Sequence, residues 1–90
     1  MQIIFCTPLQ FTLATEIFLY DESTERSEII GRVSTSGLGT ELPRLAYLHE
    51  AQTIILFGDN EYSRQIEIEI REEIAKQYSN DNIQIIIQGE

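Results

Sequence analysis

The stretch from Thr53 to Gln88 constrains the fold most, because it predicts two buried strands with a helix between them. Residues 53–57 are an apolar run that is β-branched at its start and closed by the turn signal Gly58-Asp59-Asn60. A glutamate-rich segment of helix formers follows, and residues 83–88 are a second apolar run. Two such runs are most economically buried as neighbouring parallel strands joined by a right-handed helical crossover.

The first part of the chain predicts three antiparallel strands. Residues 2–6 are apolar, and from Leu9 to Tyr20 apolar and polar residues alternate with the period of a long, half-buried strand. The end of this strand is apolar on both faces at Phe18 and Tyr20, so we expect a helix to cover it. Residues 27–35 form the third strand, with Gly31 as a bulge or a point of close approach.

Two helices complete the pattern. Thr40 is a candidate N-cap for the first, which should end near Glu50-Ala51. Its expected packing residues are Leu42, Leu45, Ala46 and Leu48. The second should start near Asn60 or Glu61 and leave Ile68 exposed. Residues 65–70 also alternate as a strand would, but the helix formers after them favour a helix. The stripe expected to face the sheet is Tyr62, Ile66, Ile70, Ile74 and Tyr78.

The predicted order is βββαβαβ, in one α/β (α+β) domain over residues 1–90 with a mixed five-stranded sheet and two helices. This order resembles the ribonuclease H-like fold, whose sheet runs 3-2-1-4-5, and the resemblance covers nearly the whole chain. Nucleases of that fold hold two Mg²⁺ with carboxylates from the first strand, the first helix and the end of the fourth strand. Glu41 or Glu50 and Asp59 match the last two positions. Because the first strand has no carboxylate, we predict no catalytic residue, metal or other cofactor.

The charge balance suggests what the chain binds. Fifteen acidic residues against six basic ones leave a net charge of -9. Such a chain is repelled by nucleic-acid backbones and anionic membranes, so we expect neither as a direct partner and predict a basic protein partner instead. The predicted partner-binding face is acidic and consists of Glu61, Glu67, Glu69, Glu72 and Glu73. The alternative is an acidic surface that only keeps the protein soluble.

Two loops are candidate ligand sites. Asp59 and Asn60 lie at the carboxyl end of a parallel strand, where open α/β sheets bind ligands. Asp59 could instead be a turn residue that satisfies backbone donors at the start of the second helix. Gly37, Gly39 and Thr40 could hold an anion against a helix N-terminus, or could simply cap the helix.

Cys6 is the only cysteine, which favours a reducing, cytoplasmic setting. It could be a nucleophile with His49 as its base, although a lone strand cysteine is more typical of a core. No signal sequence or apolar run long enough to cross a membrane is recognisable.

The predicted function is therefore a small acidic protein-interaction module without catalytic activity. A phage or mobile-element type of inhibitor that covers a basic nucleic-acid-binding surface is the sharpest version. One alternative is a small-molecule or phosphate-ligand binder, or a metal-dependent enzyme, that uses the Gly58-Asp59-Asn60 turn and the Gly37–Thr40 loop. Another is a homodimeric structural subunit in which Ile83 to Ile87 pair as edge strands.

Overall fold

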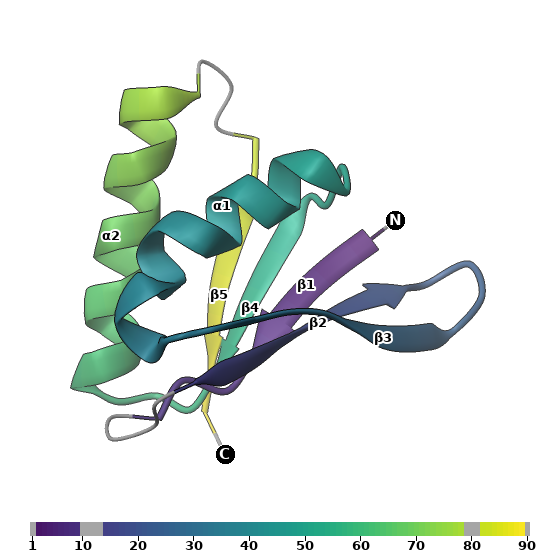
Figure 1. Ribbon diagram of the computed structural model, residues 1–90, viewed down its shortest axis with the longest axis horizontal. Helices are drawn as coiled ribbons and strands as arrows, with labels where there is room; N and C mark the ends of the chain where they lie inside the picture. Colours follow the sequence, from purple (N-terminus) through teal and green to yellow (C-terminus); the bar gives the residue numbers. More distant parts are fainter. Residues whose placement is uncertain (1, 10–13, 79–81, 90) are drawn as a thin grey trace.

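The computed structural model describes residues 2–9, 14–78 and 82–89, and it contains a mixed five-stranded sheet of order β3-β2-β1-β4-β5 (Figure 1). β1 is antiparallel to β2 and parallel to β4, β2 is antiparallel to β3, and β4 is parallel to β5. The predicted order and the ribonuclease H-like topology are therefore confirmed. The elements are β1 (Gln2–Cys6), β2 (Thr15–Asp21), β3 (Arg26–Val33), a 3-10 turn (Thr35–Gly37), α1 (Leu38–Leu48), β4 (Thr53–Phe57), α2 (Glu61–Gln77) and β5 (Gln84–Gln88).

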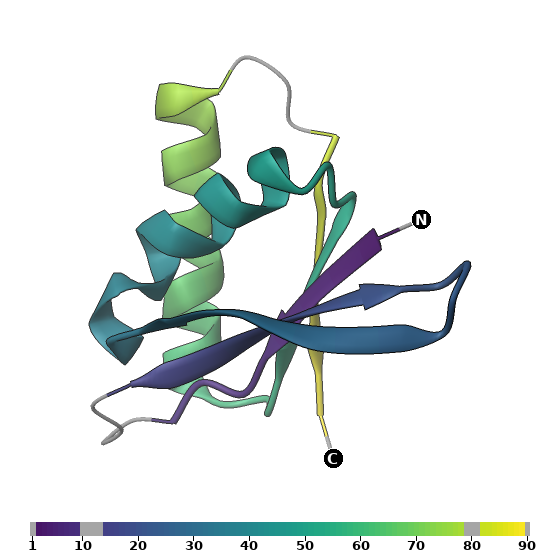
Figure 2. The same cartoon turned by 45° about the vertical axis from the view of Figure 1, so that its right-hand side comes forward.

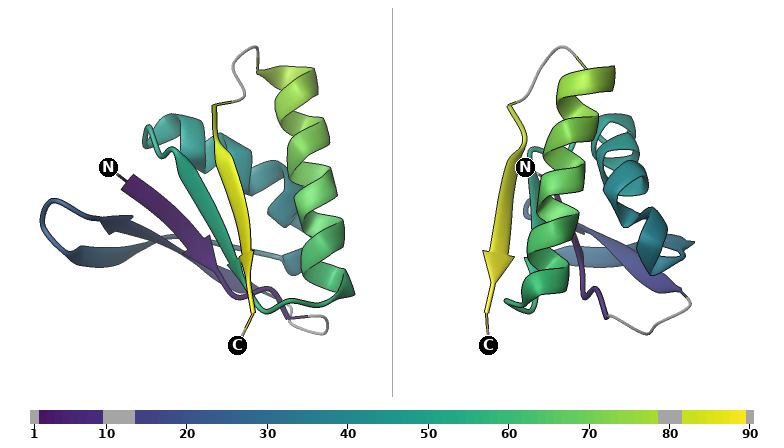
Figure 3. Two further views of the ribbon diagram at one scale, coloured as in Figure 1. Left: turned by 180° about the vertical axis from the view of Figure 1, so that it is seen from behind. Right: turned by 90° about the vertical axis from the view of Figure 1, so that its left-hand side faces the viewer.

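Both helices lie on one face of the sheet, and the core lies between them and the strands (Figure 3). Alternate strand residues point into this core because successive side chains of a strand face opposite sides. The fully buried sheet residues include Ile4, Ile17, Ile54 and Leu56, and the helices contribute Leu38, Leu42, Ala46 and Ile70. In the part of the chain that the structure describes, no helix is both long and apolar enough to span a membrane.

The two helices approach each other closely at Gly39. A Cβ atom placed on Gly39 would lie 2.6 Å from the Cβ atom of Glu69, so only glycine fits the crossing as it stands. At the other end of α1, the rings of Tyr47 and Tyr78 stack with centroids 4.1 Å apart. These two contacts hold α1 along one side of α2.

The opposite face of the sheet carries an aromatic cluster that neither described helix covers, so the predicted helix over Phe18 and Tyr20 is wrong. The register places Phe5 beside Phe18 on one side and Ile55 on the other. The rings of Phe5 and Phe18 stack at 5.1 Å, and the ring of Phe57 meets that of Phe5 edge-on at 5.6 Å. These side chains are half-buried by one another. The helix was predicted there because an apolar side chain indicates burial but does not specify what buries it.

β2 is shorter than predicted. It begins at Thr15, whereas Leu9 lies outside any strand with 56% of its surface exposed. Phe11 and Leu13, which were predicted to extend the buried face, lie outside the described residues. From Thr15 onward β2 and β3 form a hairpin that extends beyond the helices (Figure 2). The alternation therefore predicted the strand correctly from Thr15 onward.

The first helix begins and ends earlier than predicted. Thr40 lies within α1, not at its N-cap, and a 3-10 turn precedes the helix. The Thr35 hydroxyl in that turn is buried and lies 2.8 Å from the Thr15 hydroxyl, which ties the turn to the start of β2. Leu48, predicted to pack, is 64% exposed, because α1 ends at this residue.

Other local predictions are confirmed. Residues 65–70 are helical, Asn60 precedes α2, and Ile68 is 50% exposed. The β2–β3 register shifts next to Gly31, and a Cβ atom there would lie 3.4 Å from a Leu45 methyl group. Gly31 thus lies both at a bulge and at a close approach to α1.

Candidate binding site at the carboxyl end of the sheet

The ends of β1 and β4 form the place where this topology would bind a ligand. The two strands are parallel neighbours, so their carboxyl ends meet at one edge of the sheet. From β1 the chain continues to β2 on one side, whereas from β4 it continues through α2 to β5 on the other. Such a switch point opens a crevice outside the strand ends, because the two connections diverge.

Two adjoining depressions occupy this edge, and together they are called the carboxyl-end hollow below. The larger has a volume of about 620 Å³ and is lined by Pro8, Leu9, Asn60, Glu61, Tyr62 and Gln65. The smaller, about 380 Å³, is lined by Thr7, Pro8, Leu9, Phe57, Gly58, Asn60, Gln88 and Gly89. Their shared residues come from the loop after β1 and the turn after β4. The hollow therefore lies at the switch point.

The turn between β4 and α2 has a defined polar structure. Gly58 has φ of +107°, a conformation that side-chain-bearing residues rarely adopt. The Asn60 side chain caps α2, since its Oδ1 accepts a hydrogen bond from the Ser63 backbone N–H at 2.9 Å. The role suggested for Asp59 at the helix start is therefore filled by Asn60.

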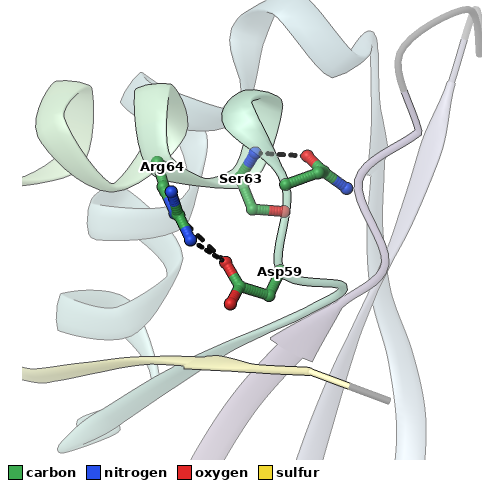
Figure 4. A network of polar contacts seen from close by, with 4 residues as sticks. Asp59, Ser63 and Arg64 are labelled. Carbon is green, nitrogen blue, oxygen red and sulfur yellow. Dashed lines mark hydrogen bonds and ion pairs between the residues drawn. The ribbon is translucent and has the colours of Figure 1, made fainter.

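Asp59 instead forms an ion pair with Arg64. The Arg64 Nε and one terminal nitrogen both donate to Asp59 Oδ1, at 3.1 and 2.9 Å (Figure 4). The two side chains are 49% and 64% exposed, so the pair stands in solvent. A pair this exposed contributes little to stability, and its guanidinium can still reach other acceptors.

The side chains at this edge do not fit the paired metal centre of ribonuclease H-like nucleases. Asp59 is the first acidic residue after β4, two positions beyond its end, whereas the residue that follows β1 is Thr7, which has no carboxylate. Glu41 is ion-paired with Arg44, and Glu50 lies beyond the end of α1. Among the described residues, no three His, Cys, Asp or Glu side chains gather as a metal site.

The residues predicted as sites are not all brought together. Glu67 is ion-paired with Arg71 at 2.8 Å, and Glu69 packs against Gly39. Glu61 borders the hollow, Glu72 is exposed and Glu73 is half-buried, so the five glutamates do not form one continuous face.

The second predicted loop lies apart from the first. Gly39 and Thr40 are in α1, preceded by Gly37, and Gly39 contacts α2 more than two turns beyond Asn60. Asn60 lines both depressions of the hollow, and Asp59 precedes it in the same turn. Sequence reasoning missed Tyr62 as a lining residue, because its spacing matched the core stripe, and it did not single out Gln65 or Arg64. Nearness to the end of β4 is the signal that could have found all three.

Cys6 lies in the core, with 1% of its surface exposed. Burial raises the pKa of its thiol to about 12, which holds it in the protonated, unreactive form. The arrangement therefore favours the core role over the nucleophile.

We expect Cys6 to react with iodoacetamide far more slowly in the folded protein than in denaturant at about pH 8, because the reagent needs an accessible thiolate. Intact-mass spectrometry over time measures the two rates. Equal rates would contradict the buried, protonated thiol.

The free energy of unfolding should also fall as pH rises from the ordinary thiol pKa of 9.0 toward about 12, since only the unfolded chain ionises its Cys6 thiol in that range.

Comparison with known proteins gives a likeness in structure alone. No protein-family model matches the chain, and no curated protein matches it. The fowlpox virus Holliday junction resolvase shares the fold with a TM-score of 0.54 and 19% identity, over 99% of this chain and 62% of that chain. The complex of fowlpox virus resolvase with its Holliday junction DNA gives a TM-score of 0.47 and 18% identity, over 99% and 60%. This chain thus spans about three fifths of the length of that resolvase.

The resolvase fold corrects the function predicted from charge. A non-catalytic inhibitor or protein-interaction module was predicted, with a basic protein partner and no direct nucleic acid. The likeness is to a Holliday junction resolvase, and it overturns that prediction together with its inhibitor version. The prediction was wrong because net charge is a property of the whole surface, whereas binding depends on the few side chains that line a site.

Proposed function

We propose that this domain binds a single strand of nucleic acid in the carboxyl-end hollow. The observation that carries the proposal is the place of the hollow, outside the ends of β1 and β4 at the switch point of the sheet. The fold shared with a junction resolvase supports nucleic acid as the ligand class.

The lining of the hollow suits an unpaired base. Tyr62 is partly buried against the core and lines the hollow, where the exposed part of its ring can stack on a base. Asn60 and Gln65 bring amide groups that suit base edges. Pro8 and Leu9 add apolar surface. These are the contacts by which proteins hold unstacked bases.

The net charge of -9 favours a single strand over a duplex. A duplex brings a dense double row of phosphates, which this acidic surface repels. A single strand has a lower charge density and presents its bases directly, so stacking can contribute without extensive phosphate neutralisation. We expect a shallow dependence of affinity on salt. The free, buried Cys6 supports the cytoplasm as the proposed compartment.

Fluorescence anisotropy with labelled single-stranded, duplex and four-way-junction DNA tests the proposal. The single strand should bind most tightly, and Tyr62→Leu should weaken its binding roughly tenfold through the lost stacking. Tyr20→Leu is the matched control, because Tyr20 lies at the opposite end of the sheet, paired with Ile3. Absence of binding to any of the three DNAs, or an equal loss in both variants, would contradict the proposed site.

A further inference from the structure

We propose that Arg64 holds a backbone phosphate of the bound strand, at the edge of the sheet where nucleases of the ribonuclease H-like fold use divalent cations. This inference rests on the proposed function and deepens it. The ribonuclease H-like fold implies a metal centre at the ends of β1 and β4, but among the described residues the side chains for one are not assembled there. A site that receives nucleic acid still needs positive charge against the phosphates.

Arg64 supplies positive charge at the end of β4. It lies in the first turn of α2, and Asp59 fixes its guanidinium through two hydrogen bonds to one carboxylate oxygen (Figure 4). Asp59 also adjoins the smaller depression of the hollow, because a Cβ atom on its lining residue Gly89 would lie 3.5 Å from the Asp59 Cβ atom. Asp59 therefore lies next to the lining of the hollow, and its carboxylate holds the Arg64 guanidinium on that side of the turn.

The guanidinium has the donors that a phosphate requires. An arginine carries five N–H donors in a planar fork, and the ion pair engages two of its nitrogens at a single oxygen. With 64% of its side chain exposed, Arg64 can turn its remaining donors to a phosphate oxygen while it stays hydrogen-bonded to Asp59. Unlike a bound cation, this contact requires no carboxylate cluster.

Asp59 is then a positioning residue with two opposing effects. Its hydrogen bonds orient Arg64, but its negative charge repels the incoming phosphate. Asp59→Asn keeps a hydrogen-bond acceptor and removes the charge, so it should tighten binding. If Asp59 held a divalent cation instead, the same substitution would weaken binding. The sign of the change separates the two arrangements.

The test measures anisotropy of a labelled single-stranded DNA with the full chain, in Mg²⁺ and in EDTA. Wild type should bind equally in both solutions. Arg64→Gln should weaken binding roughly tenfold, as expected for a lost charged hydrogen bond, and should reduce the slope of log affinity against log salt by about one. Arg71→Gln is the matched control, since Arg71 lies on the same helix, is 57% exposed and is ion-paired with Glu67. It should leave both quantities unchanged, and thermal melts establish that each variant is folded.

The outcomes separate this inference from the proposed function. If wild type binds and Arg64→Gln binds as tightly, the role of Arg64 is overturned but the proposed function stands. The same holds if Arg71→Gln weakens binding as much as Arg64→Gln does. Binding lost in EDTA and weakened by Asp59→Asn also overturns it, in favour of a cation at Asp59. If wild type binds no single-stranded DNA in either solution, the proposed function fails and the inference fails with it.

Discussion

Replacing Ile54 with alanine should lower the free energy of unfolding by about 2–5 kcal/mol, the range for truncating a fully buried isoleucine. Ile54 has none of its surface exposed, and β4 has a neighbouring strand on each side. The substitution removes methylene contacts and leaves a cavity under the helices that the surrounding strands cannot close. Urea unfolding followed by circular dichroism measures the change as a lower midpoint with an unchanged slope.

Ile55→Ala is the control for this result. Ile55 is the next residue of the same strand, but it lies on the open face beside Phe5 and Ile86 and is only half-buried. Its truncation should cost roughly half as much or less, in proportion to the apolar area that it keeps from water. A loss as large as that of Ile54→Ala would show that the open face is covered in the folded protein.

Replacing Gly39 with alanine should destabilise the domain by about 1–3 kcal/mol through overpacking. The added methyl group would lie 2.6 Å from the Cβ atom of Glu69, well inside contact distance, so α1 and α2 must move apart. At an unhindered helix position alanine is more stable than glycine by about 1 kcal/mol. A loss of stability in Gly39→Ala would therefore go against helix propensity and point to the clash with Glu69. Thermal unfolding of the two proteins measures the difference.

A double-mutant cycle identifies the cause of that loss. Glu69→Gly removes the Cβ atom that clashes, so it should restore part of the stability lost in Gly39→Ala when the two changes are combined. Thr40→Ala in the same helix turn, where the side chain is exposed, should change stability little. The close crossing of the helices would be contradicted if Gly39→Ala stabilised the protein. It would also be contradicted if the effects of Gly39→Ala and Glu69→Gly on the free energy of unfolding simply added.

The site was predictable only in part. Asp59 and Asn60 follow an apolar strand after a single glycine, so the end of that strand placed them near its carboxyl edge. The partners of these residues depend on geometry. Asn60 caps α2, and Asp59 pairs with Arg64, which lies five positions further along the chain. Spacing alone does not tell which of the two residues caps the helix and which forms the ion pair. Glu67 and Glu69 show the same limit: they are close in sequence, yet one pairs with Arg71 and the other packs at the crossing with α1.

The sequence by itself determined the order of strands and helices. Hydrophobic periodicity is local, and residues 53–88 express it clearly enough to predict a parallel pair with a helical crossover. Only the tertiary structure decided that both helices share one face, which leaves Phe5, Phe18 and Phe57 to bury one another on the other. It also decided that the loops after β1 and β4 close around one hollow. These outcomes depend on packing between residues far apart in the chain, and an apolar or charged side chain does not specify its distant neighbours.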